Sequence, residues 1–209
     1  MKGTVPQKVG RLLGNLVSHP RYVPRYFAHN VLNGKWPLDL ELPWFSYAAI
    51  DFLEKYFRPN MELFEFGSGG STLFFARRCK SVTSVEDNAR WSEIVAKRLA
   101  SRSITNVRLH SMPVHFTTPE AFENSDYLKA VQRTRADVIV VDGAEWTQDI
   151  RPLCFRAAEE QIGPGGIIVV DDSWRYRELR QANRAHRVEV FESVGPARIG
   201  VTSTDVYFY

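Results

Sequence analysis

Residues 64–72 read FEFGSGGST, an apolar run that contains an acid and is followed by three glycines among positions 67–70. The run MELFEF follows Pro59-Asn60 and ends at the first glycine, so it predicts a short buried strand. Glycines directly after a strand allow a tight turn and a close approach of a ligand to the backbone. The stretch therefore predicts a strand that carries the Glu65 carboxylate to a ligand-binding turn.

Helices and strands alternate on both sides of this turn. A helix that starts at Pro43 precedes the first strand, and further helices are expected up to residue 78, at 91–99, at 118–133 and at 150–157. Strands are expected within 61–66, 81–86, 106–110, 136–142 and 163–172. Segments 187–194 and 201–209 have no long helix between them, and we expect them to finish the sheet, one of them antiparallel. This alternation predicts an α/β fold with a mostly parallel sheet.

Acids stand at the ends of the predicted strands. Glu65 is near the end of the first strand and Glu86 ends the second, while Asp142 ends the fourth. Asp171 and Asp172 end the fifth. Open parallel sheets bind ligands beyond the carboxyl ends of their strands, near the point where the strand order reverses. One loop acid would mean little, but acids at successive strand ends indicate a site.

The glycine spacing separates two kinds of cofactor. Nicotinamide-binding folds use G-x-G-x-x-G, and this chain has Thr72 where the third glycine would stand. Glu65, two residues before Gly67, would repel a pyrophosphate and would suit a ligand that carries an ammonium group. Glu86 is placed to accept hydrogen bonds from ribose hydroxyls. The pattern argues against a dinucleotide and favours a ligand with a cationic group.

Four segments together resemble a known family. LFEFGSGGST, VTSVED, ADVIVVDG and GPGGIIVVDD, in this order, are similar to the successive motifs of class I S-adenosylmethionine-dependent methyltransferases. The resemblance covers roughly residues 43–175, and the closing strands fit the same family. It implies a Rossmann-like, seven-stranded, mostly parallel sheet with helices on both faces and an antiparallel C-terminal strand. It also implies S-adenosylmethionine as the cofactor.

The resemblance assigns the cofactor contacts residue by residue. Glu65 would face the methionine ammonium, directly or through water, and Glu86 would hold the ribose hydroxyls. The loop glycines would shape the turn under the cofactor, a serine hydroxyl would bind its carboxylate, and a second serine would lie at the adenine edge. The acid after the fourth strand is a further cofactor contact. These positions are Gly67, Gly69, Gly70, Ser71, Ser111 and Asp142.

The segments VDGAEW and VVDDSW bear on the methyl acceptor. They are similar to small-molecule O-methyltransferases of the catechol type and to macrocin O-methyltransferase, in which such acids hold a divalent cation. The resemblance thus implies a hydroxyl of a sugar, phenol or natural product as the acceptor, and Mg²⁺ bound by Asp142, Asp171 and Asp172. Oxygen-only ligands suit Mg²⁺, Ca²⁺ or Mn²⁺ better than zinc.

The proton acceptor stays open at this stage. Catechol-type enzymes often carry a lysine shortly after the first acid, and this chain has Ala144-Glu145 there. Asp142, His115, Glu145 or a metal-held hydroxide could take the proton. His115 could equally be a structural histidine. The aromatic residues Trp36, Trp44, Phe45 and Tyr47 precede the first strand, and we expect them to pack or to line the acceptor pocket.

Two other function classes remain as alternatives. An aminopropyltransferase would use the same scaffold, and VVDD resembles the acid pair that such enzymes direct at a polyamine. A non-catalytic cofactor-binding or nucleic-acid-binding protein would use the basic N-terminus. The chain lacks the Asn/Asp-Pro-Pro-Tyr/Phe tetrapeptide and the Pro-Cys pair of the best-marked nucleobase methyltransferases, which leaves RNA open.

The N-terminal residues have a charge of their own. Residues 1–35 contain six Lys or Arg and no acid, and the apolar residues of 5–17 fall near one helical face. We expect a basic helical extension over residues 1–42, which covers the core, and a methyltransferase domain over residues 43–209. Nucleic acid, a membrane surface or an organelle address would also fit a basic arm.

The composition bears on the compartment. The chain shows no apolar run long enough to span a membrane and no signal-peptide core. Cys79 and Cys154 match no metal or redox spacing and are expected to be reduced packing thiols. These features predict a cytoplasmic protein, with a homodimer kept as an alternative to a monomer.

Overall fold

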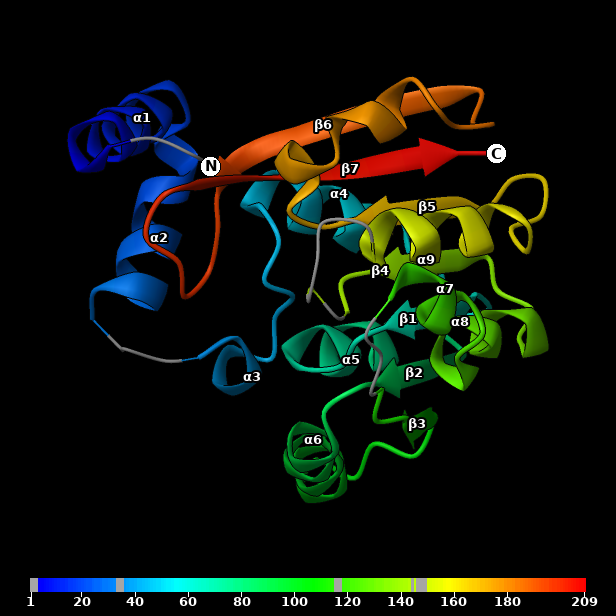
Figure 1. Cartoon of the computed structure of the whole chain (residues 1–209). Helices are drawn as coiled ribbons and strands as arrows, with labels where there is room; N and C mark the ends of the chain where they lie inside the picture. Colours follow the sequence, from blue (N-terminus) through cyan, green and yellow to red (C-terminus); the bar gives the residue numbers. More distant parts are fainter. Residues whose placement is uncertain (1–3, 33–35, 115–117, 144, 146–149) are drawn as a thin grey trace.

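The computed structural model describes residues 4–32, 36–114, 118–143, 145 and 150–209. Within them the chain builds a seven-stranded sheet with the order β3-β2-β1-β4-β5-β7-β6 (Figure 1). The strands are β1 (Glu62–Phe66), β2 (Ser81–Glu86), β3 (Val107–Ser111), β4 (Val138–Val141), β5 (Ile167–Val170), β6 (Arg187–Val194) and β7 (Val201–Phe208). β1 to β5 pair in parallel, while β7 runs antiparallel to both β5 and β6. The predicted sheet, with one antiparallel closing strand, is confirmed.

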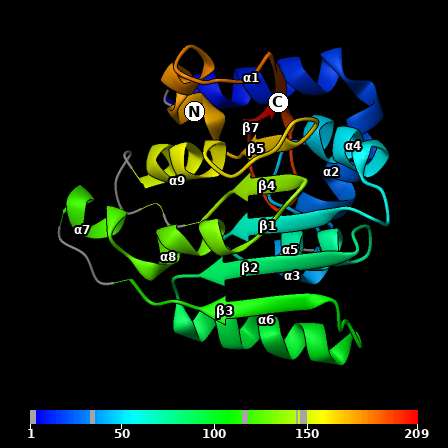
Figure 2. The ribbon, with the colours of Figure 1, turned by 90° about the vertical axis from the view of Figure 1, so that its right-hand side faces the viewer.

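The strand order reverses at β1. The chain moves outward from β1 to β2 and β3, then returns to the other side of β1 to form β4 and β5. Figure 2 shows the arrowheads of β1 to β4 pointing to the same edge of the sheet. Ligands of such sheets bind at this carboxyl edge beside the reversal, so a ligand is expected at the loops after β1, β2, β4 and β5.

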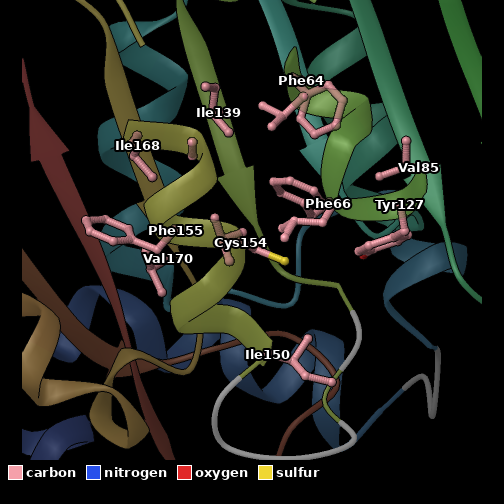
Figure 3. Packing of buried hydrophobic residues seen from close by; sticks show 14 of the residues in the cluster. Phe64, Phe66, Val85, Tyr127, Ile139, Ile150, Cys154, Phe155, Ile168 and Val170 are labelled. Atoms are coloured by element: carbon pink, nitrogen blue, oxygen red, sulfur yellow. The ribbon is translucent and has the colours of Figure 1, made fainter. Parts of the chain in front are cut away.

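Helices cover both faces of the sheet. Phe64 and Phe66 join the core under α8 (Asp126–Lys129) and α9 (Ile150–Glu159), where Figure 3 shows Phe155 of α9 close to Val170. Leu63 joins the core on the opposite face, under α4 (Tyr47–Tyr56) and α5 (Gly70–Ala76). Successive side chains of a strand point to opposite faces. Glu65 therefore shares the α5 face with Leu63.

Two helix predictions need correction. The helix before β1 begins at Tyr47 rather than near Pro43, because the Ser46 hydroxyl accepts a hydrogen bond from the Ala49 amide at 3.2 Å and caps the helix there. Segment 118–133 is broken into α7 (Pro119–Glu123), α8 and the 3-10 helix η2 (Ala130–Arg133). The Ser125 hydroxyl accepts from the Leu128 amide at 3.2 Å, which starts a new helix where the prediction had a continuous one.

The remaining helices follow β2 and β5 in the chain. α6 (Ala89–Ser101) packs beside β2 and β3 through Val95 and Leu99, and the short 3-10 helices η3 (Ser173–Arg175) and η4 (Arg177–Arg180) follow β5. Cys79 and Cys154 are buried free thiols. Among the residues described, each helix is too short or too polar to span a bilayer.

The N-terminal residues are helical and join the main core. They form α1 (Val5–Ser18), η1 (Pro20–Tyr22), α2 (Val23–Asn30) and α3 (Pro37–Leu40). Tyr22 and Tyr26 are buried in the same cluster as Leu63, and Leu12 and Leu16 of α1 pack against it. The Asn15 side chain accepts a hydrogen bond from the Val194 amide of β6 at 3.1 Å. The domain boundary between residues 42 and 43 stays a prediction.

Candidate cofactor and acceptor site

The Glu65 carboxylate is held by three hydroxyl groups. It is fully buried and accepts hydrogen bonds from Thr72 and Ser84, both at 2.7 Å. The Ser71 hydroxyl also donates to Glu65, so the group predicted to bind the cofactor carboxylate points at this acid instead. Burial raises the pKa of Glu65 to about 7 from its ordinary 4.5, and the hydroxyls lower it only in part. A nearby cation would favour loss of its proton at neutral pH.

Two of the three loop glycines are required by geometry. Gly67 has a φ of 95°, and a Cβ there would lie 2.9 Å from the Gly143 Cα in the loop after β4. A Cβ on Gly70 would lie 2.3 Å from the Pro37 carbonyl oxygen of α3. Gly69 differs, because its Cβ would meet the Trp91 ring no closer than 3.8 Å, an ordinary contact. The loop after β1 is thus pressed against both the β4 loop and the N-terminal residues.

Glu86, the last residue of β2, forms a hydrogen bond with the same loop. Its carboxylate accepts hydrogen bonds from the Ser68 hydroxyl at 2.7 Å and from the Asn88 amide at 3.0 Å. The side chain is 5% exposed, and burial raises the pKa of Glu86 to about 7. The indole nitrogen of Trp91 donates to the Ser68 carbonyl at 2.8 Å, so Trp91 braces the loop in addition to packing against α6 neighbours.

A cavity of about 520 Å³ lies at the end of β3. Ser111 pairs with Glu86 across β2 and β3 and lines the mouth of this cavity. The other lining residues come from the segment after β3 and from α7, α8 and η2: Met112, Pro113, Val114, Ala121, Ser125, Asp126, Tyr127 and Arg133. The predicted adenine-edge residue therefore borders a hollow large enough for a planar base.

An arginine connects the loops that follow β4 and β5 through hydrogen bonds. Arg151, on the first turn of α9, is 6% exposed and donates to the carbonyl oxygens of Gly143 at 3.1 Å and Asp171 at 3.0 Å. Its guanidinium also lies 3.2 Å from an Asp142 carboxylate oxygen. The Asp142 side chain is 20% exposed. Burial raises the pKa of Asp142 above its ordinary value, and Arg151 opposes the rise.

A second arginine neutralises the acids after β5. Arg198, from the loop between β6 and β7, donates to Asp172 at 2.7 Å and lies 4.0 Å from Asp171. Burial alone would raise the pKa of Asp172, but Arg198 and the hydroxyl of Thr202 lower it to about 2. Asp171 is 1% exposed and accepts from the Thr204 hydroxyl at 2.8 Å. Its pKa is raised by burial and by the neighbouring aspartates.

These contacts do not fit the predicted metal site. Nowhere in the described ranges are three or more His, Cys, Asp or Glu side chains grouped to hold a metal ion. Asp142 and Asp172 each face a guanidinium, and Asp171 accepts from Thr204, so Asp142, Asp171 and Asp172 do not converge on one cation. The sequence placed the carboxylates at the correct edge but gave no sign of the arginines that reach them.

The predicted proton acceptors differ in their surroundings. Glu145 forms an ion pair with Arg175 at 2.7 Å and accepts from the Tyr176 hydroxyl at 2.9 Å, so its charge is already compensated. His115 lies outside the described residues. Asp142 keeps a partly exposed side chain at the sheet edge. Of the aromatic residues before β1, Phe45 and Tyr47 are fully buried, whereas Trp44 is 42% exposed.

Several residues of the site were not predicted from the sequence. Arg151 and Arg198 have no motif, and the only available signal was a charged residue among the apolar positions of α9. Asp205 of β7 is fully buried, accepting from Ser173 and Arg180, both at 2.6 Å. An acid at position 205 in the alternating run VTSTDVYFY could have indicated a buried ion pair.

A model described as a methyltransferase domain matches residues 64–173, more than half of the 209-residue chain. The match starts at the strand that carries Glu65 and ends just after Asp172. No curated protein is significantly similar in sequence.

Solved structures share the fold at low sequence identity. The O-methyltransferase TomG from Streptomyces achromogenes, in complex with S-adenosylmethionine, has a TM-score of 0.62 at 18% identity, covering 91% of this chain and 97% of its own. A proposed O-methyltransferase from Klebsiella pneumoniae has a TM-score of 0.61 at 14% identity, over 97% and 98%. An rRNA methylase from Streptococcus thermophilus has a TM-score of 0.56 at 13% identity, and the match covers 77% of this chain and 93% of the methylase. The resemblance found in the sequence is confirmed.

Proposed function

The chain belongs to the methyltransferase domain family, and we propose that it transfers the methyl group of S-adenosylmethionine to a hydroxyl of a small molecule. The observation that carries this proposal is the pair of buried acids, Glu65 and Glu86, on either side of a glycine loop at the reversal of strand order. Acids there suit a ligand with an ammonium group at one end and a ribose further along. A sugar, a phenol or a natural product with a hydroxyl is the proposed acceptor class.

The cofactor would run along the loop after β1. Glu65 would lose its proton and compensate the methionine ammonium, and the Ser71 hydroxyl would then be free to rotate toward the cofactor carboxylate. Glu86 would accept from the ribose hydroxyls, and the cavity beside Ser111 would take the adenine. Gly67 and Gly70 keep this path open by letting the backbone lie close to its neighbours. Gly69 would leave room for the cofactor because it has no side chain, and not because its backbone conformation requires glycine.

The acceptor would bind beyond the ends of β4 and β5. Trp44 lies there with its ring 5.0 Å from the Arg198 guanidinium, which offers a flat apolar wall next to polar groups. Asp142 is the proposed general base, since a carboxylate whose pKa is raised toward neutrality accepts a proton more readily. Bound S-adenosylmethionine would supply the methyl group, and Asp142 would take the proton that the acceptor hydroxyl loses.

The protein would accelerate this transfer mainly by position. The attacking oxygen, the methyl carbon and the sulfur must lie in line, and the fixed loops after β1 and β4 would hold them so. Because Asp142 and Asp172 already face guanidinium groups, the proposed transfer does not use a divalent cation. We expect methyl transfer to persist after exhaustive chelation, and loss of activity that Mg²⁺ restores would show that the acids rearrange around a metal.

Two alternatives have less support. An aminopropyltransferase would direct its acid pair at a polyamine, but Asp172 pairs with Arg198 and Asp171 is buried beside it, so both are already compensated. A nucleic-acid methyltransferase has the rRNA methylase as a structural neighbour, which speaks for the fold alone. A cytoplasmic location and a homodimer stay predictions.

The test combines binding with turnover. Calorimetry should detect S-adenosylmethionine binding to the wild type, and labelled cofactor should methylate at least one member of a panel of catechols, phenols and sugars. Asp142→Asn should keep cofactor affinity and lose most of kcat, while Glu145→Gln, its matched control, should change kcat much less. Absence of cofactor binding would overturn the proposal, and transfer to RNA with none to hydroxyl compounds would replace the acceptor class.

A further inference from the structure

The loop between β6 and β7 carries Arg198 to the acids after β5, and it is tightly held. Its first residue, Gly195, is buried, and a Cβ there would lie 2.4 Å from the Phe45 carbonyl oxygen. The segment that leads into α4 therefore presses on this loop. Ala197, within the turn, has a φ of 49°, which lies in the left-handed region that most residues avoid. Such a backbone persists only where its surroundings fix it.

Asn30, the last residue of α2, also holds this loop. Its side-chain oxygen accepts a hydrogen bond from the Arg198 amide at 2.5 Å, and its side-chain nitrogen donates to the Gly195 carbonyl oxygen at 3.2 Å. The same nitrogen donates to the Tyr26 carbonyl oxygen at 3.0 Å, so both amide hydrogens and the oxygen have partners. Figure 1 shows the loop beside α2. One side chain thus bridges the two ends of the turn and ties them to the N-terminal helices.

The side chain of Arg198 extends from this turn into the site. Its guanidinium donates to Asp172 at 2.7 Å and lies 4.0 Å from Asp171. It also lies 5.0 Å from the centre of the Trp44 ring, which is a cation–π contact. The Arg198 side chain is only 16% exposed, whereas Trp44 is partly open to solvent. The backbone position of residue 198 therefore decides where the guanidinium meets the acid and the indole.

We propose that Asn30 is a positioning residue for the acceptor site. By fixing the backbone of Arg198, it sets the contacts of the guanidinium with Asp172 and Trp44 without touching the acceptor itself. The inference rests on the proposed function, which places the acceptor beyond the ends of β4 and β5 and the cofactor along the loop after β1. In this arrangement the N-terminal helices complete the acceptor site in addition to covering the core.

A purely structural role for Asn30 predicts a different result. Hydrogen bonds that only stabilise the fold lower the melting temperature when they are lost, but they leave the kinetics of the folded enzyme unchanged. Asn183 offers a matched case, because its side chain donates to the Leu179 carbonyl oxygen at 2.7 Å and accepts from the Ala185 amide at 3.0 Å. It precedes β6, at the opposite end of this strand from Arg198. Comparing the two asparagines therefore isolates the connection to Arg198.

The experiment compares the kinetics of full-length variants on the catechol, phenol or sugar that the wild type methylates best. Asn30→Ala should lower kcat/KM for this acceptor by about ten- to a hundredfold, because small displacements of positioning groups have effects of this size. It should leave the Kd for S-adenosylmethionine unchanged, and Asn183→Ala should change neither quantity. Asn30→Ala should have little further effect in an Arg198→Ala background, since residues that act through one another are not additive.

Hydrogen exchange of the ligand-free protein tests the contact without turnover. Residues 195–200 should exchange faster in Asn30→Ala than in the wild type or Asn183→Ala. Asn30→Asp, which keeps an oxygen for the Arg198 amide, replaces Asn30→Ala if that variant does not fold, with a smaller effect in the same direction.

Unchanged exchange, equal kinetic losses in Asn30→Ala and Asn183→Ala, or additive effects of Asn30→Ala and Arg198→Ala would overturn the inference. A wild type that methylates no hydroxyl compound would overturn the proposed function and this role with it, and the exchange result would then tell a wrong contact from a wrong function.

Discussion

The Glu86 carboxylate accepts hydrogen bonds from the Ser68 hydroxyl and the Asn88 amide, and Glu86 pairs across β2 and β3 with Ser111, which lines the cavity. Glu86→Gln should lower S-adenosylmethionine affinity by about ten- to a hundredfold, because it removes a charge-assisted hydrogen bond of about 1.5–3 kcal/mol. Calorimetry measures the change, with Glu93→Gln on the exposed side of α6 as the control. Equal affinity in wild type and Glu86→Gln would remove Glu86 from the site.

The glycine loop allows a second matched comparison. Gly67→Ala places a Cβ 2.9 Å from the Gly143 Cα at a φ of 95°, so it should lower the free energy of unfolding by about 1–3 kcal/mol and weaken cofactor binding. Gly69→Ala meets only an ordinary contact at 3.8 Å and should change both quantities little. Urea unfolding and calorimetry on the two variants give the comparison. Similar losses in both would mean that the loop is not pressed against β4 as described.

Single residues also show where sequence reasoning succeeded. Glu65 and Glu86 could be placed because each ends an apolar run next to glycines or a loop, a pattern visible along the chain. Arg151 and Arg198 could not be placed, because their partners are set by three-dimensional contacts. Arg198 comes from a loop that meets Asp172 only once β7 pairs with β5. The three aspartates predicted as metal ligands lie at one edge of the sheet, and the sequence alone did not show that Arg151 and Arg198 reach two of them.

At the scale of elements, α9 holds the loops after β4 and β5 through Arg151. Arg151→Met should lower the free energy of unfolding by about 3–5 kcal/mol at pH 8, since Asp142 is left without its counter-ion. The loss should be smaller at pH 5, where Asp142 can be protonated because burial raises its pKa. Arg156→Met, at an exposed position of the same helix, is the control. A pH-independent loss in Arg151→Met would show that the carbonyl contacts alone matter.

The elements themselves were predicted unevenly, for physical reasons. The strands could be located because continuous apolar runs covered on both faces stand out between turns. The helix boundaries at Pro43 and within 118–133 could not, because Ser46 and Ser125 both cap helices through hydroxyl groups, and a serine in a sequence does not show whether it caps.

For the whole molecule, the buried acids make stability depend on pH. Burial raises the pKa values of Glu65 and Glu86 to about 7 from an ordinary 4.5, so the folded state binds protons more tightly than the unfolded state. Their contribution to stability is fully present below pH 4.5 and is lost as the pH rises through 7. Asp172 has the opposite sign, with a pKa near 2, but it titrates below this window.

The ligand-free protein should therefore melt at a lower temperature at pH 8 than at pH 5.5. S-adenosylmethionine should reduce the difference, since its ammonium favours ionised Glu65, and its affinity should rise from pH 5.5 to 8. Glu65→Gln should flatten both profiles. Scanning calorimetry and titration across the range supply the measurements, and a cofactor affinity independent of pH would contradict the assignment of Glu65 to the ammonium.

The placement of β7 bears on how the chain is made. β7 follows β6 in sequence but lies between β5 and β6, so β6 joins the sheet only through β7. A ribosome releases the chain from the N-terminus onward. While residues 195–208 are still within the ribosome, the parallel strands can assemble. During this time β5 has an unpaired, apolar edge with which other chains can associate. The time until β7 pairs with β5 is therefore the time during which the nascent chain is most exposed to aggregation.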